Sequence, residues 1–213
     1  MDQLACACGV AGHALRIDCQ DDSIEPIRLP DAETAQMLVV DSGVRHTLAD
    51  GEYARRREAC AHAARALGVD SLREITDITT VNRAVLNDME YRCVKHVQSE
   101  NQRVCEAAEA LRTSDLVTLG GLLKASHVSL RDEYCVSCDE LDALVEIANE
   151  IEGVFGSRMT GGGFGGCTII LVSPDGAERV RATLPERYEQ RTGQACTIMR
   201  VRAVEGARVV QSS

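Results

Sequence analysis

Aromatic residues are scarce in this sequence. Only 3% of its 213 residues are Phe, Tyr or Trp, and tryptophan is absent. Hydrophobic residues nevertheless make up 45% of the chain, which is enough for a sizeable core. That core must therefore be built from Ala, Leu, Val and Ile. A chain of this length corresponds to one large domain or to two small ones.

Long hydrophobic runs and long basic runs are also missing. The uninterrupted apolar runs reach only about six residues, far short of the roughly 20 that a membrane helix needs. The start MDQLACACGV has neither the cationic nor the long apolar segment typical of a secretory signal. The formal net charge is −10, and residues 55–57 form the longest basic run. These features argue against nucleic acid or an anionic membrane surface as the main partner.

Cysteine, by contrast, is abundant, with ten residues. Most of them lie on apolar faces, as Cys60, Cys105 and Cys167 do, and this placement is typical of reduced thiols in a cytoplasmic protein. The segment Cys135-Val-Ser-Cys138 has the only spacing that resembles a redox or zinc motif. Because no second such pair and no histidine pair accompany it, we expect no metal site.

Hydrophobic periodicity predicts an α+β protein, because strands and helices are mixed rather than strictly alternating. We expect strands at 13–19, 25–29, 37–40, 154–158, 167–172, 197–201 and 207–210, and helices at 52–67, 89–112, 115–130, 141–151 and 177–190. Turns are expected at Asp41-Ser42-Gly43 and at Pro174-Asp175-Gly176. Ser137 and Glu140 have the spacing of a capping box at the start of a helix.

The segment RMTGGGFGGCTIILV contains the most unusual sequence in the chain, because five of the six residues from Gly161 to Gly166 are glycine. It is not a dinucleotide fingerprint, since a strand-like run follows where a helix is required. It is not a Walker loop either, since Cys167 stands where the lysine belongs and no lysine lies nearby to neutralise a phosphate. Two readings remain: a tight turn, or a loop whose backbone N–H groups face an anion. The excess of glycines favours the binding loop.

The same residues carry a family resemblance. The run MTGGGFGGC, after Ser-Arg and a helix of the ELDALVE type, resembles the third signature motif of the GHMP small-molecule kinases, and in detail that of the galactokinase family. Met1-Asp2-Gln3 is similar to that family's mid-chain MDQ. HALRIDC, VRHTLADGEYARRREAC and HVSLRDEYCVSCDELD match further segments in the same order. The resemblance covers nearly all of this chain but only about half of such an enzyme.

The resemblance implies a role for individual residues. In galactokinases the Asp of MDQ faces the anomeric hydroxyl and is described as the catalytic base, a role that falls here on Asp2. A carboxylate at a helix start is held ionised by the helix dipole, as a base requires. Tyr53 matches a tyrosine that contacts galactose, and Arg45 lies near the active site, where it could serve the transferring phosphate. Without the resemblance, the sequence favours a solvated terminal residue for Asp2. Tyr53 could equally be a packing residue, and Arg45 could equally be a surface arginine.

The family motif beside the nucleotide falls on five glycines: Gly161, Gly162, Gly163, Gly165 and Gly166. Its role in the family resembles support of the phosphate loop. One departure is Gly43, where relatives commonly have Asn. His127, Asp132, Cys135 and Cys138 lie in a matching segment, and we assign them no chemistry.

Two parts of the family pattern are absent from the sequence: a sugar-recognition segment similar to GRVNLIGEHTDY and a serine- and glycine-rich phosphate loop. The cofactors implied are ATP and Mg²⁺, with the metal ligands expected in a missing N-terminal half. The resemblance implies a C-terminal domain with a ferredoxin-like sheet and added helices over 48–213. Residues 1–47 would be a remnant of the N-terminal kinase domain. Strands between His13 and Val40 would then lack sheet partners and leave an edge open to self-association.

Several functions stay open at this point. The chain is part of a galactokinase, or a related kinase for N-acetylgalactosamine or arabinose, or a non-catalytic binding or sensor module derived from a kinase. An unrelated α+β regulatory domain with a glycine turn is the remaining alternative. The DNA upstream of the Met1 codon would show whether the reading frame continues into the missing motifs. We expect the chain alone to be inactive.

Overall fold

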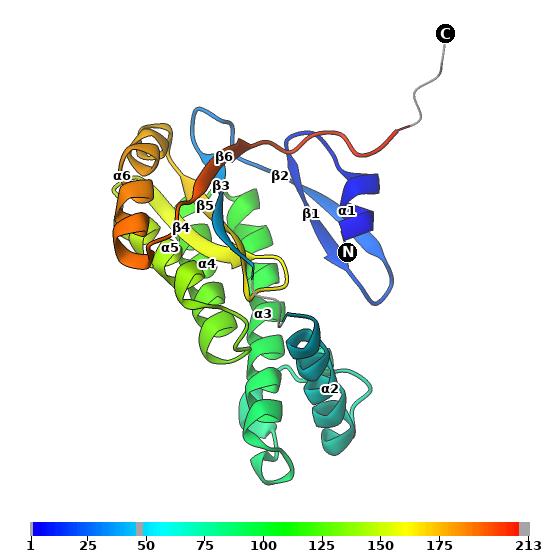
Figure 1. Cartoon of the computed structure of the whole chain (residues 1–213). Helices are drawn as coiled ribbons and strands as arrows, with labels where there is room; N and C mark the ends of the chain where they lie inside the picture. The colour runs from blue at the N-terminus through cyan, green and yellow to red at the C-terminus, as the bar shows by residue number, and fades with distance from the viewer. Residues whose placement is uncertain (1, 46–48, 209–213) are drawn as a thin grey trace.

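The structure is a computed structural model that describes residues 2–45 and 49–208. Figure 1 shows a four-stranded sheet with helices packed on it and a separate two-stranded hairpin. The elements are α1 (Asp2–Cys8), β1 (His13–Asp18), β2 (Ser23–Arg28), β3 (Gln36–Arg45), α2 (Ala49–Leu67), η1 (Leu72–Glu74), η2 (Ile78–Thr80), η3 (Arg83–Val85), α3 (Asp88–Arg112), α4 (Leu116–Asp132), α5 (Asp139–Glu150), β4 (Val154–Thr160), β5 (Gly165–Val172), α6 (Pro174–Thr192) and β6 (Thr197–Val201). The mixture of helices with antiparallel strands confirms the α+β class.

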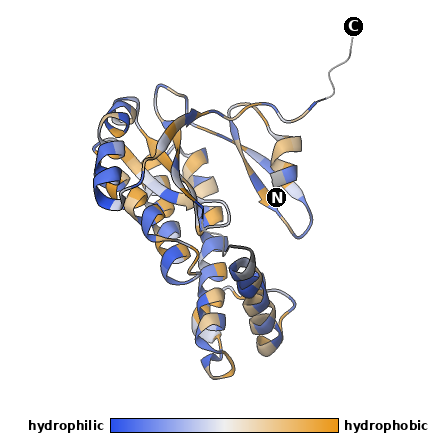
Figure 2. Cartoon of the chain, viewed as in Figure 1, coloured by the Kyte–Doolittle hydropathy of each residue, from blue (hydrophilic) through white to orange (hydrophobic). Residues whose placement is uncertain are grey.

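The four-stranded sheet has the order β4-β5-β3-β6 and lies between two layers of helices. Alternate side chains of its central strands point to opposite faces. Leu38 and Val40 are fully buried and pack with α5 and α6 on one face. Leu171 packs on the other face with Leu116 and Leu119 of α4. Figure 2 shows hydrophobic residues along these strands and hydrophilic ones over the outer side of α6.

The position of β3 corrects one expectation. The strands between His13 and Val40 do not share a sheet, because β1 pairs with β2 while β3 pairs with β5 on one side and β6 on the other. The predicted turn at Asp41-Ser42-Gly43 is also wrong, since β3 continues to Arg45 through an irregular register. Ser42 is fully buried there, and its carbonyl accepts a 2.9 Å hydrogen bond from the Tyr188 hydroxyl.

Helix starts follow local capping, with two corrections. Pro174-Asp175-Gly176 is the first turn of α6 rather than a turn before it, because Ser173 Oγ accepts from the Gly176 N–H at 3.2 Å and proline suits the first helical position. The predicted capping box at Ser137 and Glu140 is not formed, so that prediction is wrong. The N-cap of α5 is Cys138, whose side chain makes no capping hydrogen bond, and the Ser137 hydroxyl donates to Asp142 instead.

The segment after β6 ties α1 to the rest of the chain. The N–H of Ala207 donates to the Cys6 carbonyl at 2.7 Å, and the N–H of Gly206 donates to the Gly9 carbonyl at 2.8 Å. Ala207 and Arg208 therefore do not form the predicted strand, and the remaining predicted positions, 209–210, lie outside the described residues. Figure 1 shows this segment running beside α1.

Helices α2 and α3 form a second core away from the sheet. Ala63 and Ala64 of α2 and Val94 of α3 pack with Leu72 and Leu86 from the connection between the two helices. Figure 1 shows this pair of helices projecting beyond the sheet.

Candidate functional site

The glycine-rich segment is the connection between β4 and β5. The ladder closes at Thr160 opposite Cys167, and the chain reverses between them. Four of its glycines, Gly161, Gly163, Gly165 and Gly166, have φ between 83° and 113°, and Phe164 has φ 58°. Such left-handed backbone is costly for residues with a Cβ atom, so the turn itself requires most of the glycines.

Packing gives two of these glycines a second structural reason. A Cβ atom on Gly163 would lie 2.1 Å from the Val136 carbonyl oxygen, and one on Gly165 would lie 2.5 Å from the Val44 carbonyl oxygen. Gly162 differs from all the others in the loop. Its φ is outside the left-handed range, and no described atom lies within 4 Å of the position where a Cβ would stand. The fold therefore explains four glycines and leaves Gly162 without a structural reason.

The loop rests on the segment between α4 and α5. The Phe164 N–H donates to the Val136 carbonyl at 2.8 Å. Arg56 of α2, which is only 7% exposed, holds the same segment from the other side. Its Nε donates to the Tyr134 carbonyl at 2.6 Å, and its Nη2 donates to the Cys135 carbonyl at 3.1 Å. A rigid support thus connects α2 to the glycine loop, although the two are about 100 residues apart in sequence.

Arg45 lies at the end of β3 against the loop. It is paired in register with Gly165, and its Nη1 atom is 3.9 Å from the position of a Cβ on Gly166. Its guanidinium also forms a 3.0 Å ion pair with Asp41 and remains 68% exposed. The Gly43 backbone N–H and, to a lesser extent, Arg45 lower the pKa of Asp41 against the opposing effect of burial. The structure therefore brings Arg45 together with the predicted glycines and gives the loop a cation.

Tyr53 and Asp2 are placed on two different helices. Tyr53 is 58% exposed and stands one turn before Arg56 on α2, so the ring lies near the support of the loop. Asp2 is the first residue of α1, and its side chain lies outside the described part of the chain. Figure 1 shows α1 beside the β1–β2 hairpin and well apart from α2.

A buried histidine supports the strand that leads into the loop, and sequence reasoning gave it no role. His127 Nδ1 accepts from the Met159 N–H at 3.3 Å, so the ring proton is on Nε2, which faces Asp142 Oδ1 at 3.1 Å. Burial raises the pKa of Asp142, but the close approach of His127 and the hydrogen bond from Ser137 outweigh it and hold the pKa below its usual value. Nothing in the sequence indicates this contact, because the partners come from α4, α5 and β4.

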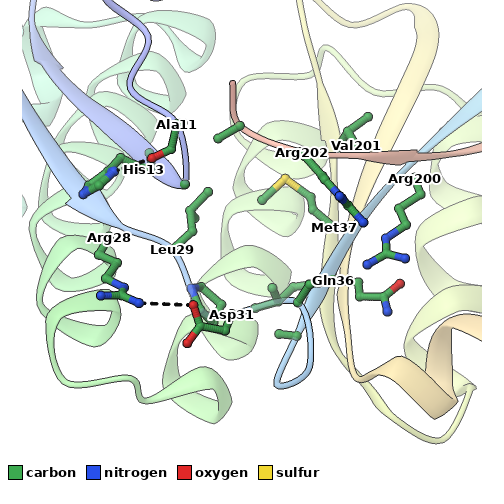
Figure 3. A pocket seen from close by; sticks show the side chains of 17 residues that line it. Ala11, His13, Arg28, Leu29, Asp31, Gln36, Met37, Arg200, Val201 and Arg202 are labelled. Atoms are coloured by element: carbon green, nitrogen blue, oxygen red, sulfur yellow. Dashed lines mark hydrogen bonds and ion pairs between the residues drawn. The ribbon is translucent and has the colours of Figure 1, made fainter. Parts of the chain in front are cut away.

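A cavity of about 710 Å³ lies elsewhere, between the β1–β2 hairpin and strands β3 and β6. Figure 3 shows Arg28, Arg200 and Arg202 around it, with Met37 and Leu29 at its wall. Arg28 is paired with Asp31 at 3.2 Å. The lining includes none of the residues predicted for the site, so this cavity is separate from the glycine loop.

The groups that the glycine loop presents, backbone N–H groups and the Arg45 guanidinium, suit an anion rather than a metal ion. The outer side of Gly161 and Gly162 is open, so phosphate oxygens can approach the backbone there, and Arg45 offers a positive charge. Within residues 2–45 and 49–208, no three His, Cys, Asp or Glu side chains come close enough to hold a metal ion. The loop therefore offers backbone N–H groups and one cationic side chain to an anion such as a phosphate. No described helix is long and apolar enough to cross a membrane.

Comparison with known proteins gives consistent results. Residues 107–190 match the family model for the C-terminal region of GHMP kinases. A galactokinase of Chloroflexus aurantiacus is 49% identical in an alignment of 201 positions that covers 91% of this chain and 51% of that protein. A galactokinase of Bos taurus is 45% identical over 211 residues, with 99% of this chain and 53% of that protein covered. The chain thus spans about half the length of these relatives.

Solved structures show the same likeness. The structure of Lactococcus lactis galactokinase complexed with galactose superposes with a TM-score of 0.89 at 28% identity, covering 95% of this chain and 54% of that one. Mevalonate kinase of L. major, in complex with R-mevalonate, has a TM-score of 0.55 at 21% identity and shows only the shared fold. Both the sequence and the fold are therefore similar to one group of kinases.

Proposed function

Because this chain belongs to the GHMP kinase family and matches galactokinases over nearly its whole length, we propose that it supplies the C-terminal half of a galactokinase. The reaction would transfer the γ-phosphoryl group of ATP to the anomeric hydroxyl of α-D-galactose, giving galactose 1-phosphate and ADP. The observation that carries this proposal is the 0.89 TM-score with a galactokinase that holds galactose. Gly162 supports it, since a binding surface explains a glycine that the fold does not require.

Each predicted residue has a distinct task in this proposal. The Asp2 carboxylate accepts or orients the proton of the anomeric hydroxyl. The Tyr53 hydroxyl forms a hydrogen bond to the sugar. Arg45 and the N–H groups of the glycine loop stabilise negative charge on the nucleotide phosphates. The loop stays in place because Val136 and Arg56 fix it from behind.

The other half of such an enzyme would supply what these residues do not. Mg²⁺ would neutralise phosphate charge, and its ligands are assigned to the N-terminal half. We propose the division of this chain into a remnant of the N-terminal domain, 1–47, and a C-terminal domain, 48–213. Strand β3 belongs by sequence to the 1–47 segment, but it pairs with β5 and β6 of the 48–213 domain. It therefore joins the two parts. A cytoplasmic location remains part of the proposal.

Co-expression tests the function. The 213-residue chain would be produced with the N-terminal half of one of the matched galactokinases, and galactose 1-phosphate would be measured with ATP, Mg²⁺ and galactose. We expect product from the pair and none from the chain alone, which we also expect to associate through the open edges of the β1–β2 hairpin. Asp2→Asn should lower kcat by roughly 10²–10⁴-fold, as loss of an acid–base group does.

Matched substitutions separate the alternatives. Tyr53→Phe should weaken galactose binding by about 0.5–1.5 kcal/mol, the value of one net hydrogen bond. Tyr91→Phe, on α3, is the control and should leave the KM for galactose unchanged. Binding of galactose without product would favour the sensor module, and preference for N-acetylgalactosamine or arabinose would favour a related kinase. Wild-type kcat in Asp2→Asn would remove that residue from the mechanism.

A further inference from the structure

The segments that frame the cavity beside the β1–β2 hairpin are joined to one another by backbone pairing. The Gly12 N–H, at the start of the hairpin, donates to the Ala203 carbonyl at 3.2 Å, and the Leu29 N–H donates to the Gly12 carbonyl at 2.9 Å. On the other side, Met37 of β3 is paired in register with Val201 of β6. The cavity of about 710 Å³ is therefore framed by bonded segments, and its volume is in the range of preformed small-molecule sites.

The wall of this cavity is mainly apolar. Its larger apolar side chains come from the β2–β3 connection and from three strands of the sheet, and they are Leu29, Pro30, Met37, Leu171 and Val201. Ala35 and Leu171 are each only 4% exposed, so part of the wall belongs to the hydrophobic core. The uncharged polar side chains among the lining residues are His13 and Gln36. A sugar would need more hydrogen-bond partners than these two supply, whereas an apolar group would fit the wall.

Positive charge gathers at the same cavity, although the protein as a whole has a formal charge of −10. Arg28, Arg200 and Arg202 line it, against the single carboxylate of Asp31. Arg28 forms an ion pair with Asp31 at 3.2 Å, whereas Arg200 and Arg202 have no ion pair within the part of the chain that the structure describes. These two arginines are two positions apart along an extended segment, so they lie on the same side of it. Figure 3 shows both beside the cavity, on the β3 side.

We propose that this cavity binds an amphipathic monocarboxylate, with the apolar body against Met37 and Leu171 and the carboxylate on Arg200 and Arg202. A guanidinium group suits a carboxylate because its N–H groups can form two parallel hydrogen bonds to the two oxygens. An uncharged apolar ligand would leave the arginines without a partner, and a small anion would leave the apolar wall wet. The lining includes none of the residues assigned to galactose or ATP, so this site is independent of the proposed kinase function.

Nuclear magnetic resonance with octanoate as the probe tests the proposal on the complete 213-residue chain. The methionine methyl groups would be labelled with ¹³C, because Met37 lines the cavity while Met89 of α3 and Met159 of β4 do not. Octanoate should move the Met37 resonance and leave those of Met89 and Met159 in place. Each CH₂ group removed from the probe should weaken binding by about fourfold, as loss of buried apolar area does.

Two further probes and two matched variants separate charge from apolar contact. Neutral 1-octanol should bind about tenfold more weakly than octanoate, since it cannot form charge-assisted hydrogen bonds. The double variant Arg200→Gln/Arg202→Gln should weaken octanoate by about the same factor and leave 1-octanol unchanged. The control, Arg187→Gln/Arg191→Gln on α6, removes the same charge from exposed positions outside the cavity and should bind octanoate like the wild type.

Several outcomes would overturn the proposal. Equal shifts of all three methionine signals would mean non-specific adsorption, and octanoate that binds no more tightly than acetate would remove the apolar wall from the site. Unchanged affinity in Arg200→Gln/Arg202→Gln would remove the arginines. The titration would be repeated with the co-expressed N-terminal half of a matched galactokinase. A Met37 signal that no longer responds to octanoate there would also contradict the proposal, because the other half would then occupy the cavity.

Discussion

Glycine is used in opposite ways in two regions of this molecule. Where α4 crosses β4, a Cβ on Gly120 would lie 2.2 Å from the Phe155 carbonyl oxygen, and one on Gly156 would lie 2.1 Å from the Gly120 carbonyl oxygen. At the tip of the loop between β4 and β5, a Cβ on Gly161 or Gly162 would meet no described atom within 4 Å. The first region needs glycine because backbones touch. The second region is not covered by described atoms, so a ligand can approach its backbone.

The largest effect is expected at the crossing. Gly120→Ala should lower the free energy of unfolding by about 3 kcal/mol, because the new methyl group would force α4 away from β4. Urea denaturation of the chain measures this. Gly121→Ala is the matched control, since this neighbour in the same helix has no described atom within 4 Å. It should stabilise the chain by about 0.5–1 kcal/mol through helix propensity.

Equal effects of Gly120→Ala and Gly121→Ala on the free energy of unfolding would contradict the claim that backbone contact requires glycine at the crossing. They would mean that helix propensity alone decides the outcome and that the close approach of α4 to β4 relaxes without cost.

A fall in pH is expected to have the next largest effect on stability. It should loosen the segment behind the glycine loop before it loosens β4. Tyr134 stacks on His96 with ring centroids 4.3 Å apart, and His96 Nδ1 lies 2.9 Å from Ser129 Oγ. Burial lowers the pKa of His96 to about 4; Glu100 and Glu133 oppose this shift, while Arg103 and Arg158 add to it. The unfolded chain, with a histidine pKa near 6.5, therefore binds the proton first.

The contribution of His96 is complete above pH ~6.5 and is lost as the pH falls toward 4, up to about 2–3 kcal/mol. Amide hydrogen exchange should accelerate first at Val136 and Phe164, behind the loop, and later at Met159 in β4. His96→Phe should remove most of this pH dependence. A wild-type chain whose stability is constant from pH 6.5 to 4.5 would contradict the prediction.

Within the loop itself, the effect on stability should depend on which glycine is replaced, and the smallest effect is expected at Gly162. Gly163→Ala should cost about 2 kcal/mol, because Gly163 has φ 88° and faces the Val136 carbonyl. Gly162→Ala should change stability by less than about 0.5 kcal/mol, as at an open surface position. In the co-expressed enzyme, however, Gly162→Ala should raise the KM for ATP. An unchanged KM for ATP would favour the alternative interpretation, in which the glycines serve only the turn between β4 and β5.

Much of the architecture followed from local pattern. Apolar alternation predicted β1, β5 and β6 closely, and helical periodicity predicted α2, α3 and α5 to within about three residues, the usual precision at element ends. The misses have physical causes. The Asp41-Ser42-Gly43 sequence favours a turn, and Gly43 does have φ 74°, with its N–H donating to Asp41 Oδ1 at 3.0 Å. The chain makes only an irregularity in β3 there and continues to Arg45, and the Ser42 carbonyl accepts a hydrogen bond from Tyr188, far along the chain. Ser137 bonds to Asp142 and therefore does not cap α5.

The candidate site was predictable to a similar degree. The glycine run and its likeness to a kinase motif identified the loop, and the structure places Arg45 beside it. Its supporting residues were not predictable, because Arg56, His127 and Val136 act through contacts between segments far apart in the chain. A role for Asp2 and for Tyr53 remains a prediction.

By itself, the sequence determined the α+β class, the positions of most helices and strands, the family, and the loop to examine, because periodicity, glycine content and motif order are local properties. Only the tertiary structure decided that β3 lies between β5 and β6, that Gly162 alone in its loop has no structural reason, and that Arg56 of α2 holds the segment on which the loop rests. These facts depend on which segments pack together. Packing is set by the sum of many weak contacts over the whole chain, which no short stretch of sequence contains.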